Sequence, residues 1–164
     1  MCGILGKVDF KNKINKNDFI KSLNMLRHRG PDNSNILELS NALFGHQRLS
    51  ILDLSKNADQ PMQSSDGRYT IIYNGEIYNF KYLKKELSTD YNDWKSNSDT
   101  EVVLKSYQKW GIDCLDKFEG MFAFVIWDDF KKQIFGARDR IGVKPFYYYN
   151  KNQSFTFSSR PSSI

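Results

Sequence analysis

Segments with the pattern of β-strands occupy both ends of this chain, and their distribution constrains the fold more than any other feature of the sequence. Runs that are rich in β-branched and aromatic residues, or that alternate between apolar and polar residues, predict strands. These runs cover residues 3–10, 35–39, 42–45, 68–73, 120–127, 133–137, 146–149 and 154–158. Two main helices are expected between the strand-rich ends, which differs from alternating βαβ units. The pattern therefore predicts an α+β layer fold.

Helices are predicted where apolar residues recur at helical spacing. The predicted helices cover residues 17–27, 80–87 and 99–110. Residues suited to capping a helix N-terminus stand at their starts: Asn17 or Asp18, Asn79, and Ser98 or Asp99. The first helix is expected to stop at Gly30-Pro31, because proline cannot continue a helix. A short helical turn at 113–118 places Cys114 among apolar neighbours, which predicts a packing role.

The composition is that of an ordinary globular protein with one domain. The chain has 164 residues, of which 40% are hydrophobic, 15% aromatic and 26% charged, so it can bury a substantial core. Its two cysteines, Cys2 and Cys114, form no CxxC pair and no disulfide framework. No basic region with a following apolar run marks a secretory signal, and no segment approaches the roughly 18 apolar residues of a membrane span. We therefore expect a cytoplasmic protein with no membrane partner.

Other function classes lack the motifs that they need. The net charge of +5 comes from scattered lysines, and no zinc-finger, RRM or GXXG-type signature accompanies it, so no nucleic-acid partner is expected. A metal site is not expected either, because the only histidines, His28 and His46, have no cluster of ligands beside them. Neither a Walker A loop nor a GxGxxG motif is present.

Cys2 offers the first candidate for catalysis. If Met1 is removed, which the small side chain of Cys2 permits, one residue carries both a thiol and a free α-amine. The amine, with a pKa of about 7.7–8.0, can act as a base near neutral pH. A terminal nucleophile that carries its own base is a recognised arrangement for acyl transfer. The alternative is that Cys2 is simply the first residue of a buried strand, since free cysteine behaves as a small hydrophobic residue.

Three further positions allow both a structural and a functional interpretation. Arg48 falls between apolar stretches, where it can extend to the surface or offer a fixed fork to a carboxylate. The Asn74-Gly75 pair follows a predicted strand and precedes a predicted helix, so it is expected to form a turn. This turn is either an ordinary connection or one that presents a side-chain amide and a backbone N–H as donors to an oxyanion. Asp99 is fully explained as a helix cap.

The order of the motifs resembles the glutaminase domain of glutamine-dependent asparagine synthetases. This domain is a class II glutamine amidotransferase of the N-terminal-nucleophile hydrolase group. The resemblance covers roughly residues 2–159, and it implies a four-layer αββα sandwich of two antiparallel sheets. It rests on seven motifs: residues 1–4 (MCGI), 28–32 (HRGPD), 45–51 (GHQRLSI), 74–79 (NGEIYN), 98–101 (SDTE), 120–124 (GMFAF) and 138–145 (RDRIGVKP).

The resemblance also implies a role for each matching residue. Cys2 is expected to attack the side-chain amide of L-glutamine, with its α-amine as base, and Asn74 and Gly75 to form the oxyanion hole. Arg48 is expected to hold the substrate carboxylate, and Asp99 with Glu76 the ammonium group. The backbone of Leu49, Ser50, Ile51 and Leu52 is expected to line the same pocket. The implied reaction forms a thioester, hydrolyses it to glutamate and releases ammonia, and no metal takes part.

The chain departs from the family after residue 159. Family members continue through a Ser-Glu-Ile/Met-Lys-Ala-Leu type of stretch into an ATP-dependent synthetase domain, whereas here residues 160–164 (RPSSI) form a short tail. We therefore expect an isolated glutaminase domain, either an engineered fragment or a naturally shortened product, that needs no cofactor. ATP and Mg would belong to the missing synthetase domain or to a separate partner that accepts ammonia. The alternatives are a non-catalytic interaction module with this fold and a basic nucleic-acid binder.

Overall fold

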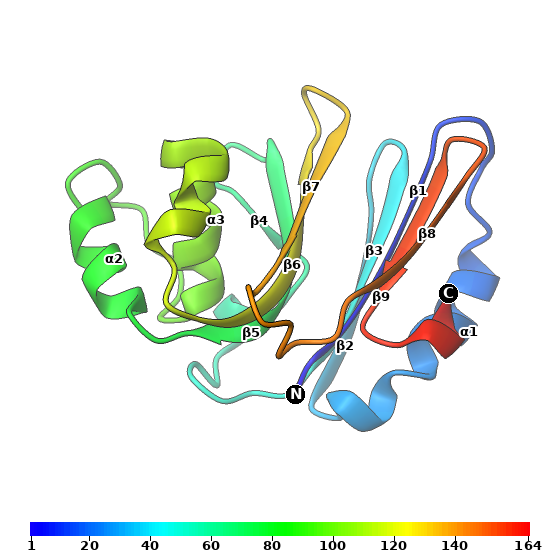
Figure 1. The fold of residues 1–164 in the computed structure, drawn as a ribbon, viewed down its shortest axis with the longest axis horizontal. Coiled ribbons are helices and arrows are strands. Elements are labelled where there is room, and N and C mark those ends of the chain that lie inside the picture. The colour runs from blue at the N-terminus through cyan, green and yellow to red at the C-terminus, as the bar shows by residue number, and fades with distance from the viewer.

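Two antiparallel β-sheets pack face to face in the computed structural model, which describes residues 1–164 (Figure 1). Sheet A has the strand order β2-β3-β1-β9-β8, and sheet B has the order β4-β5-β6-β7. The strands of sheet A are β1 (Gly3–Asp9), β2 (Asn33–Glu38), β3 (Ala42–Arg48), β8 (Tyr147–Lys151) and β9 (Ser154–Ser158). The strands of sheet B are β4 (Met62–Gln63), β5 (Tyr69–Ile77), β6 (Gly120–Asp128) and β7 (Gln133–Arg138).

Helices cover the outer face of each sheet. The α-helices are α1 (Lys16–Asn24), α2 (Phe80–Leu87) and α3 (Asp99–Trp110), and the 3₁₀ turns are η1 (Arg27–Arg29), η2 (Lys56–Ala58), η3 (Gly111–Lys117) and η4 (Pro161–Ser163). Figure 1 shows α1 outside sheet A, with α2 and α3 outside sheet B. The molecule thus has four layers in the order αββα, which confirms the predicted fold class. None of its helices is both long enough and apolar enough to cross a membrane.

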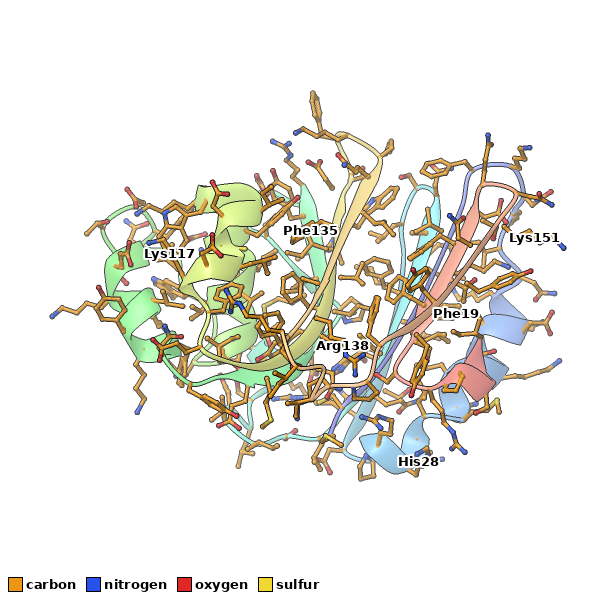
Figure 2. All side chains as sticks on the ribbon, viewed as in Figure 1. Phe19, His28, Lys117, Phe135, Arg138 and Lys151 are labelled. Carbon is orange, nitrogen blue, oxygen red and sulfur yellow. The ribbon has the colours of Figure 1, made fainter.

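Alternation along the strands divides the apolar residues among three cores, because successive side chains of a strand point to opposite faces. In β1, Ile4 belongs to the core between the sheets, while Leu5 packs with Phe19 of α1. In β5, Ile72 belongs to the core between the sheets, while Ile71 faces the helices. Figure 2 shows Phe19 beside sheet A and other side chains filling the space between the layers.

Several strands extend further than predicted, and two of these extensions place residues of interest. β3 runs to Arg48, so this arginine ends a strand. β5 runs to Ile77, so Asn74 and Gly75 lie inside a strand and the predicted strand-to-helix turn is wrong. The reason is distant in sequence, because β6 pairs with β5 along its whole length and matches Gly75 to Phe122. The short strand β4 was not predicted.

The first helix is shorter than predicted and has a different cap. The side chain of Asn15 accepts the N–H groups of Asn17 and Asp18, so neither of these two residues is the cap. The helix ends at Asn24, and the 3₁₀ turn η1 replaces its expected last turn. Asn79 does precede α2, but its side chain bonds the backbone of Lys117 in η3 and of Glu119 rather than capping the helix.

The C-terminal residues fold back onto sheet A. The hydroxyl of Ser163 lies 2.6 Å from that of Ser158 at the end of β9, and Ser163 is buried. The 3₁₀ turn η4 therefore closes against the strand that precedes it. Cys114 is fully buried in the core beneath the helices, which agrees with the predicted packing role.

Candidate functional site

The side chains of Cys2, Arg48 and Asn74 converge because all three continue the inward-facing rows of their strands. Residue 2 precedes β1, in which Ile4 faces the other sheet. Arg48 lies four residues after Phe44 in β3, and Asn74 lies two residues after Ile72 in β5, so each is on the inward face of its strand. Strand alternation thus aims the three side chains into the space between the sheets. They meet where the N-terminal end of β1 lies beside the C-terminal end of β3.

A pocket of about 200 Å³ opens at this end of the sandwich. It gathers the predicted residues Cys2, Arg48, Leu49, Ile51, Leu52, Asn74, Gly75, Glu76 and Asp99. Ser50 is the exception, since it does not line the pocket, and its N–H donates to Asp32 Oδ2 at 2.7 Å. The pocket therefore joins the N-terminal residues with residues of β3, β5 and α3 that are far away in sequence.

The Cys2 thiol is held against the backbone just after β3. Leu49 N–H donates to Cys2 Sγ at 3.4 Å, and Sγ lies 3.6 Å from Leu49 O. Burial raises the pKa of the thiol, while the Leu49 N–H, the N-terminal charge and Arg48 act in the opposite direction. The thiol is thus protonated at neutral pH and needs a base before it can attack.

The Arg48 guanidinium is nearly buried and already makes three hydrogen bonds. Nη1 donates to Ser55 O at 2.9 Å and to Asp59 Oδ1 at 2.6 Å, and Nη2 donates to Asp53 O. An arginine has five N–H donors, so Nε–H and one N–H of Nη2 stay available. Arg48 is therefore locked in place and can still offer two donors to a carboxylate.

Asn74 and Gly75 provide two hydrogen-bond donors without a partner in the chain. Asn74 is buried, and its Nδ2 has no acceptor. On the edge of β5 that faces away from β6, Gln60 Oε1 accepts Tyr73 N–H, and Asp99 Oδ2 accepts Ile77 N–H. The alternating ladder directs the N–H of Gly75 to this same edge, between those two bonds. The side-chain amide of Asn74 and the N–H of Gly75 are therefore both presented by strand β5, and not by the turn that the sequence predicts.

Asp99 faces the pocket from the first turn of α3 and does more than begin a helix. Its Oδ2 accepts the hydroxyl of Tyr73 at 2.6 Å and the N–H of Ile77 at 3.0 Å. Burial raises the pKa of this carboxyl, and the two hydrogen bonds act in the opposite direction. No cation pairs with it in the chain, and Oδ1 can accept an ammonium group. Ser98, at the N-cap position, makes no side-chain cap bond.

The His-Arg-Gly-Pro-Asp segment supports the site, in addition to ending the first helix. Arg29 Nε donates to Cys2 O at 3.1 Å and so anchors the residue that carries the thiol. Gly30 packs so closely on β3 that a Cβ there would lie 2.2 Å from Gln47 O. The Asp32 N–H donates to Arg48 O at 3.0 Å. This segment thus fixes the neighbouring ends of β1 and β3.

Sequence reasoning missed several residues that shape the pocket. Asp59 pairs with Arg48, and it lies in a loop with no pattern that could have indicated this. Gln60 donates to Thr100 Oγ1 at 3.1 Å and so connects the same loop to α3. Lys144 lines the pocket beside Met1, and its only signal in the sequence was its place in the motif at 138–145. No three His, Cys, Asp or Glu side chains come together as metal ligands.

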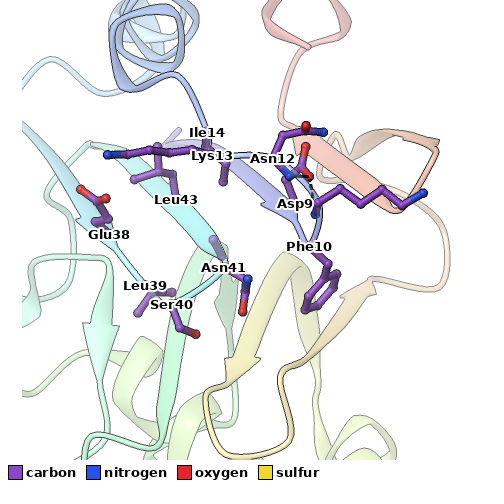
Figure 3. Close-up of a pocket in the computed structure, with 12 residues that line it drawn as sticks. Asp9, Phe10, Asn12, Lys13, Ile14, Glu38, Leu39, Ser40, Asn41 and Leu43 are labelled. Carbon is purple, nitrogen blue, oxygen red and sulfur yellow. Dashed lines mark hydrogen bonds between the residues drawn. The ribbon is translucent and has the colours of Figure 1, made fainter.

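A second hollow, of about 270 Å³, lies at the other end of β1 and β3 (Figure 3). Both of its carboxylates are already used within the chain. Asp9 Oδ1 accepts the N–H groups of Lys11 and Asn12, and Glu38 pairs with Lys16. It holds no nucleophile with a base beside it, whereas the pocket at Cys2 combines a thiol with unpartnered donors and opposite charges.

Comparison of the sequence with known proteins gives consistent results. The sequence model of the glutamine amidotransferase domain matches residues 1–164. The chain is 45% identical over 168 residues to asparagine synthetase [glutamine-hydrolyzing] 3 of Bacillus subtilis, covering 100% of this chain and 27% of that protein. It is 40% identical to putative asparagine synthetase [glutamine-hydrolyzing] 2 of Methanocaldococcus jannaschii, covering 100% of this chain and 35% of that protein. The chain thus spans about a quarter to a third of these relatives.

Comparison of the structure identifies the same fold. The glutamine phosphoribosylpyrophosphate amidotransferase from B. subtilis, solved with ADP and GMP, superposes with a TM-score of 0.83 at 18% identity. The match covers 99% of this chain and 42% of that one. The predicted four-layer sandwich is thereby also found in a solved structure. On the evidence of its sequence and its fold, this chain belongs to the glutamine amidotransferase domain family.

Proposed function

We propose that this chain hydrolyses the side-chain amide of L-glutamine to glutamate and ammonia, with Cys2 as the nucleophile. One observation carries the proposal: the Cys2 thiol shares a pocket of about 200 Å³ with the unpartnered donors of Asn74 and Gly75 and with the opposite charges of Arg48 and Asp99. A thiol with oxyanion donors performs acyl transfer. A fixed cation and a fixed anion suit the two charges of an amino acid.

Substrate binding follows from the groups that the chain leaves free. The two available N–H donors of Arg48 bind the α-carboxylate, while Asp59 and two carbonyl groups hold the guanidinium in place. Asp99 Oδ1 and the neighbouring Glu76 bind the α-ammonium group. The side chain of glutamine then extends toward Cys2, and its amide oxygen lies at the donors of Asn74 and Gly75.

The reaction needs the base that removal of Met1 creates. The α-amine of Cys2 takes the thiol proton, through a water molecule, as sulfur bonds to the amide carbon and the carbonyl electrons move to oxygen. Asn74 and Gly75 stabilise that oxyanion. The protonated amine gives its proton to the amide nitrogen, the C–N bond breaks and ammonia leaves. Water then adds to the thioester, the C–S bond breaks, and glutamate and the thiol form.

The test is glutamate release by purified protein whose N-terminus has been determined by mass spectrometry. Protein that begins at Cys2 is expected to release glutamate from glutamine. Cys2→Ala should lower the rate at least about a thousandfold with the fold retained. The matched control is Cys114→Ala, which removes the other cysteine and should retain activity. Turnover by protein that keeps Met1 would refute the terminal-amine mechanism. Correctly processed protein without turnover would instead be a non-catalytic module with this fold.

We further propose that the ammonia passes to a synthetase part like that of the asparagine synthetases among its relatives. Exposed apolar residues line the pocket or adjoin its lining residues in the sequence, which supports such a contact. Ile51 and Leu52 line the pocket, and Leu54 comes soon after them in the sequence. Ile141 and Val143 come just before Lys144, which also lines the pocket. Leu54→Ser with Ile141→Ser should weaken co-purification with a synthetase partner without lowering glutamate release. Equal co-purification would contradict this surface.

The remaining conditions of the reaction also belong to the proposal. Hydrolysis at Cys2 needs no cofactor in this chain, because ATP and Mg²⁺ serve the synthetase part. A free thiol nucleophile is suited to the cytoplasm, where thiols stay reduced, and both cysteines are free in the structure. Glutamate release should therefore be unchanged by EDTA and lost after oxidation of Cys2. Loss of activity in EDTA would contradict a cofactor-free reaction.

A further inference from the structure

Lys144 is a buried cation without a carboxylate partner, and it lies in the pocket of Cys2. The residue is only 5% exposed, and the one hydrogen-bond contact of its Nζ is with Met1 Sδ at 3.3 Å. Lysine is almost never buried unless it is paired, because an isolated buried charge is costly. The other buried lysine, Lys105, is paired with Asp93 at 2.6 Å and lies over the ring of Tyr91. Burial of Lys144 therefore needs another reason.

The loop between β7 and β8 is built to hold Lys144 in this place. The carboxylate of Asp139 accepts the N–H groups of Phe122, Val143 and Lys144 at 2.7–3.2 Å. Figure 2 shows Arg138 where the chain leaves β7 toward sheet A. Its Nε donates to Lys144 O at 2.5 Å. The motif at 138–145, which takes no part in the glutamine hydrolysis proposed above, is thus a rigid support for one ammonium group.

The ammonium group of Lys144 contacts the N-terminal residue of the chain. Met1 is bonded to the nitrogen of Cys2, and its side chain lines the pocket against Lys144 Nζ. Removal of Met1 takes away the one hydrogen-bond contact of Nζ and leaves the ammonium in the pocket that also holds the freed end of the chain. The titratable and charged groups that line this pocket or bond to residue 2 come from several elements and loops: Arg29, Arg48, Asp53, Tyr73, Glu76, Asp99 and Lys144. Among the three cations, Arg48 alone has a carboxylate, Asp59, to balance it.

We propose that Lys144 is a positioning residue for the reaction at Cys2. Its fixed ammonium keeps the freed α-amine of Cys2 uncharged, and so able to accept a proton. It also favours the negative charge that forms on sulfur and on the amide oxygen. A like charge disfavours protonation of an amine, and an unpaired cation that is itself buried acts strongly on developing negative charge. This inference rests on the proposed glutamine hydrolysis. It assigns Lys144 to the side-chain amide of glutamine, where the reaction takes place, rather than to the α-carboxylate and α-ammonium groups.

The test compares Lys144→Met and Lys144→Arg in protein that begins at Cys2. Lys144→Met keeps the length of the side chain without its charge, so kcat should fall about tenfold or more while KM for glutamine changes less than about threefold. The acid limb of the kcat/KM pH profile should move up by about one pH unit, because the base and the thiol lose a nearby positive charge. Lys144→Arg keeps the positive charge, so both kcat and the pH profile should stay close to those of the wild type. The matched control, Lys105→Met, should leave the pH profile unmoved.

A second readout does not depend on turnover. The rate at which iodoacetamide alkylates Cys2, followed by peptide mass spectrometry against pH, should also shift upward in Lys144→Met. If wild-type protein releases no glutamate, the proposed function fails, and the alkylation profile still decides the role of Lys144. Unchanged profiles in folded Lys144→Met would overturn the inference. A raised KM at unchanged kcat, or a loss that arginine does not rescue, would overturn it as well.

Discussion

Asp99 carries the anionic end of the proposed substrate site and has no cation of its own. Its Oδ2 is held by Tyr73 and Ile77, so the carboxylate is already oriented before the substrate binds. Asp99→Asn keeps an oxygen for both donors and removes the charge. A hydrogen bond to a charged group contributes about 2–3 kcal/mol, so KM for glutamine should rise roughly 30- to 150-fold.

Steady-state kinetics with a thermal unfolding control checks this prediction. Tyr73→Phe is the matched variant, because it removes one bond to Asp99 and keeps the charge, and its effect on KM should be smaller. If Asp99→Asn binds glutamine as well as wild type, the ammonium site lies elsewhere in the pocket.

His46 makes the stability of the fold depend on pH. It is fully buried between the sheets, with Nε2 3.3 Å from Tyr73 O, and burial lowers its pKa to about 4. In the unfolded chain a histidine titrates near 6.5. Between these values the unfolded chain binds a proton that the folded chain does not, so stability falls as pH decreases from 6.5 to 4. The loss reaches about 3 kcal/mol at the acid end of this window.

Urea unfolding at pH 7 and pH 4.5 measures this contribution. His46→Gln keeps a donor for Tyr73 O without a titrating group, so it should lose less stability than wild type on acidification. His28→Gln is the matched control, because His28 is exposed at the surface, and it should show the wild-type pH dependence. Equal pH dependence in His46→Gln and wild type would contradict the assignment.

At the scale of elements, the β5–β6 pair sets the geometry of the proposed oxyanion donors, Asn74 and Gly75. A Cβ on Gly75 would lie 2.5 Å from Met121 O and 2.8 Å from Phe122 Cα. Both are backbone atoms that cannot move without separating the strands. Gly75→Ala should therefore lower the free energy of unfolding by about 2 kcal/mol and Tm by roughly 4–8 °C, and it should also lower kcat.

Gly136 in β7 is the matched control for this change. A Cβ there would meet its nearest atom at 3.5 Å, an ordinary contact. Gly136→Ala should change stability by less than about 1 kcal/mol, and it should retain activity. Calorimetry on both variants separates close strand packing from a general preference for glycine in strands. Similar melting temperatures for the two variants would contradict the steric argument.

At the scale of the whole molecule, the core between the sheets holds the site together. Phe157 of β9 is fully buried there, and its ring packs on those of Phe44 and Phe146 at centroid distances of 5.6 and 5.7 Å. Its strand pairs with β1, which begins next to Cys2. Phe157→Ala should cost about 3–5 kcal/mol, because it removes a large side chain and leaves a cavity.

Denaturant unfolding checks this cost against an exposed phenylalanine. Phe130 is 82% exposed at the turn between β6 and β7, so Phe130→Ala should cost less than about 1 kcal/mol. The two variants lose the same atoms, and only the burial differs. A small effect at Phe157 would show that the two sheets do not depend on this core.

The sequence by itself determined the local features of this protein. Alternation and helical spacing report which side of each segment is apolar, so most strands and the existence of all three α-helices were predictable from neighbouring residues. The motifs identified the family, and the cysteine that follows Met1 indicated the proposed nucleophile. The predicted boundaries were wrong where a distant segment decided them, as at Asn74 and Gly75, which β6 draws into a strand across nearly fifty residues.

Only the tertiary structure decided what surrounds the nucleophile. Asp59 reaches Arg48 from a loop, Asp99 faces the pocket as well as starting a helix, and Lys144 is carried in by the connection between the sheets. None of these contacts follows from local pattern, because strand register and sheet packing fix which chain ends meet. A sequence records the chemistry that each residue can perform, whereas long-range pairing selects the residues that perform it together.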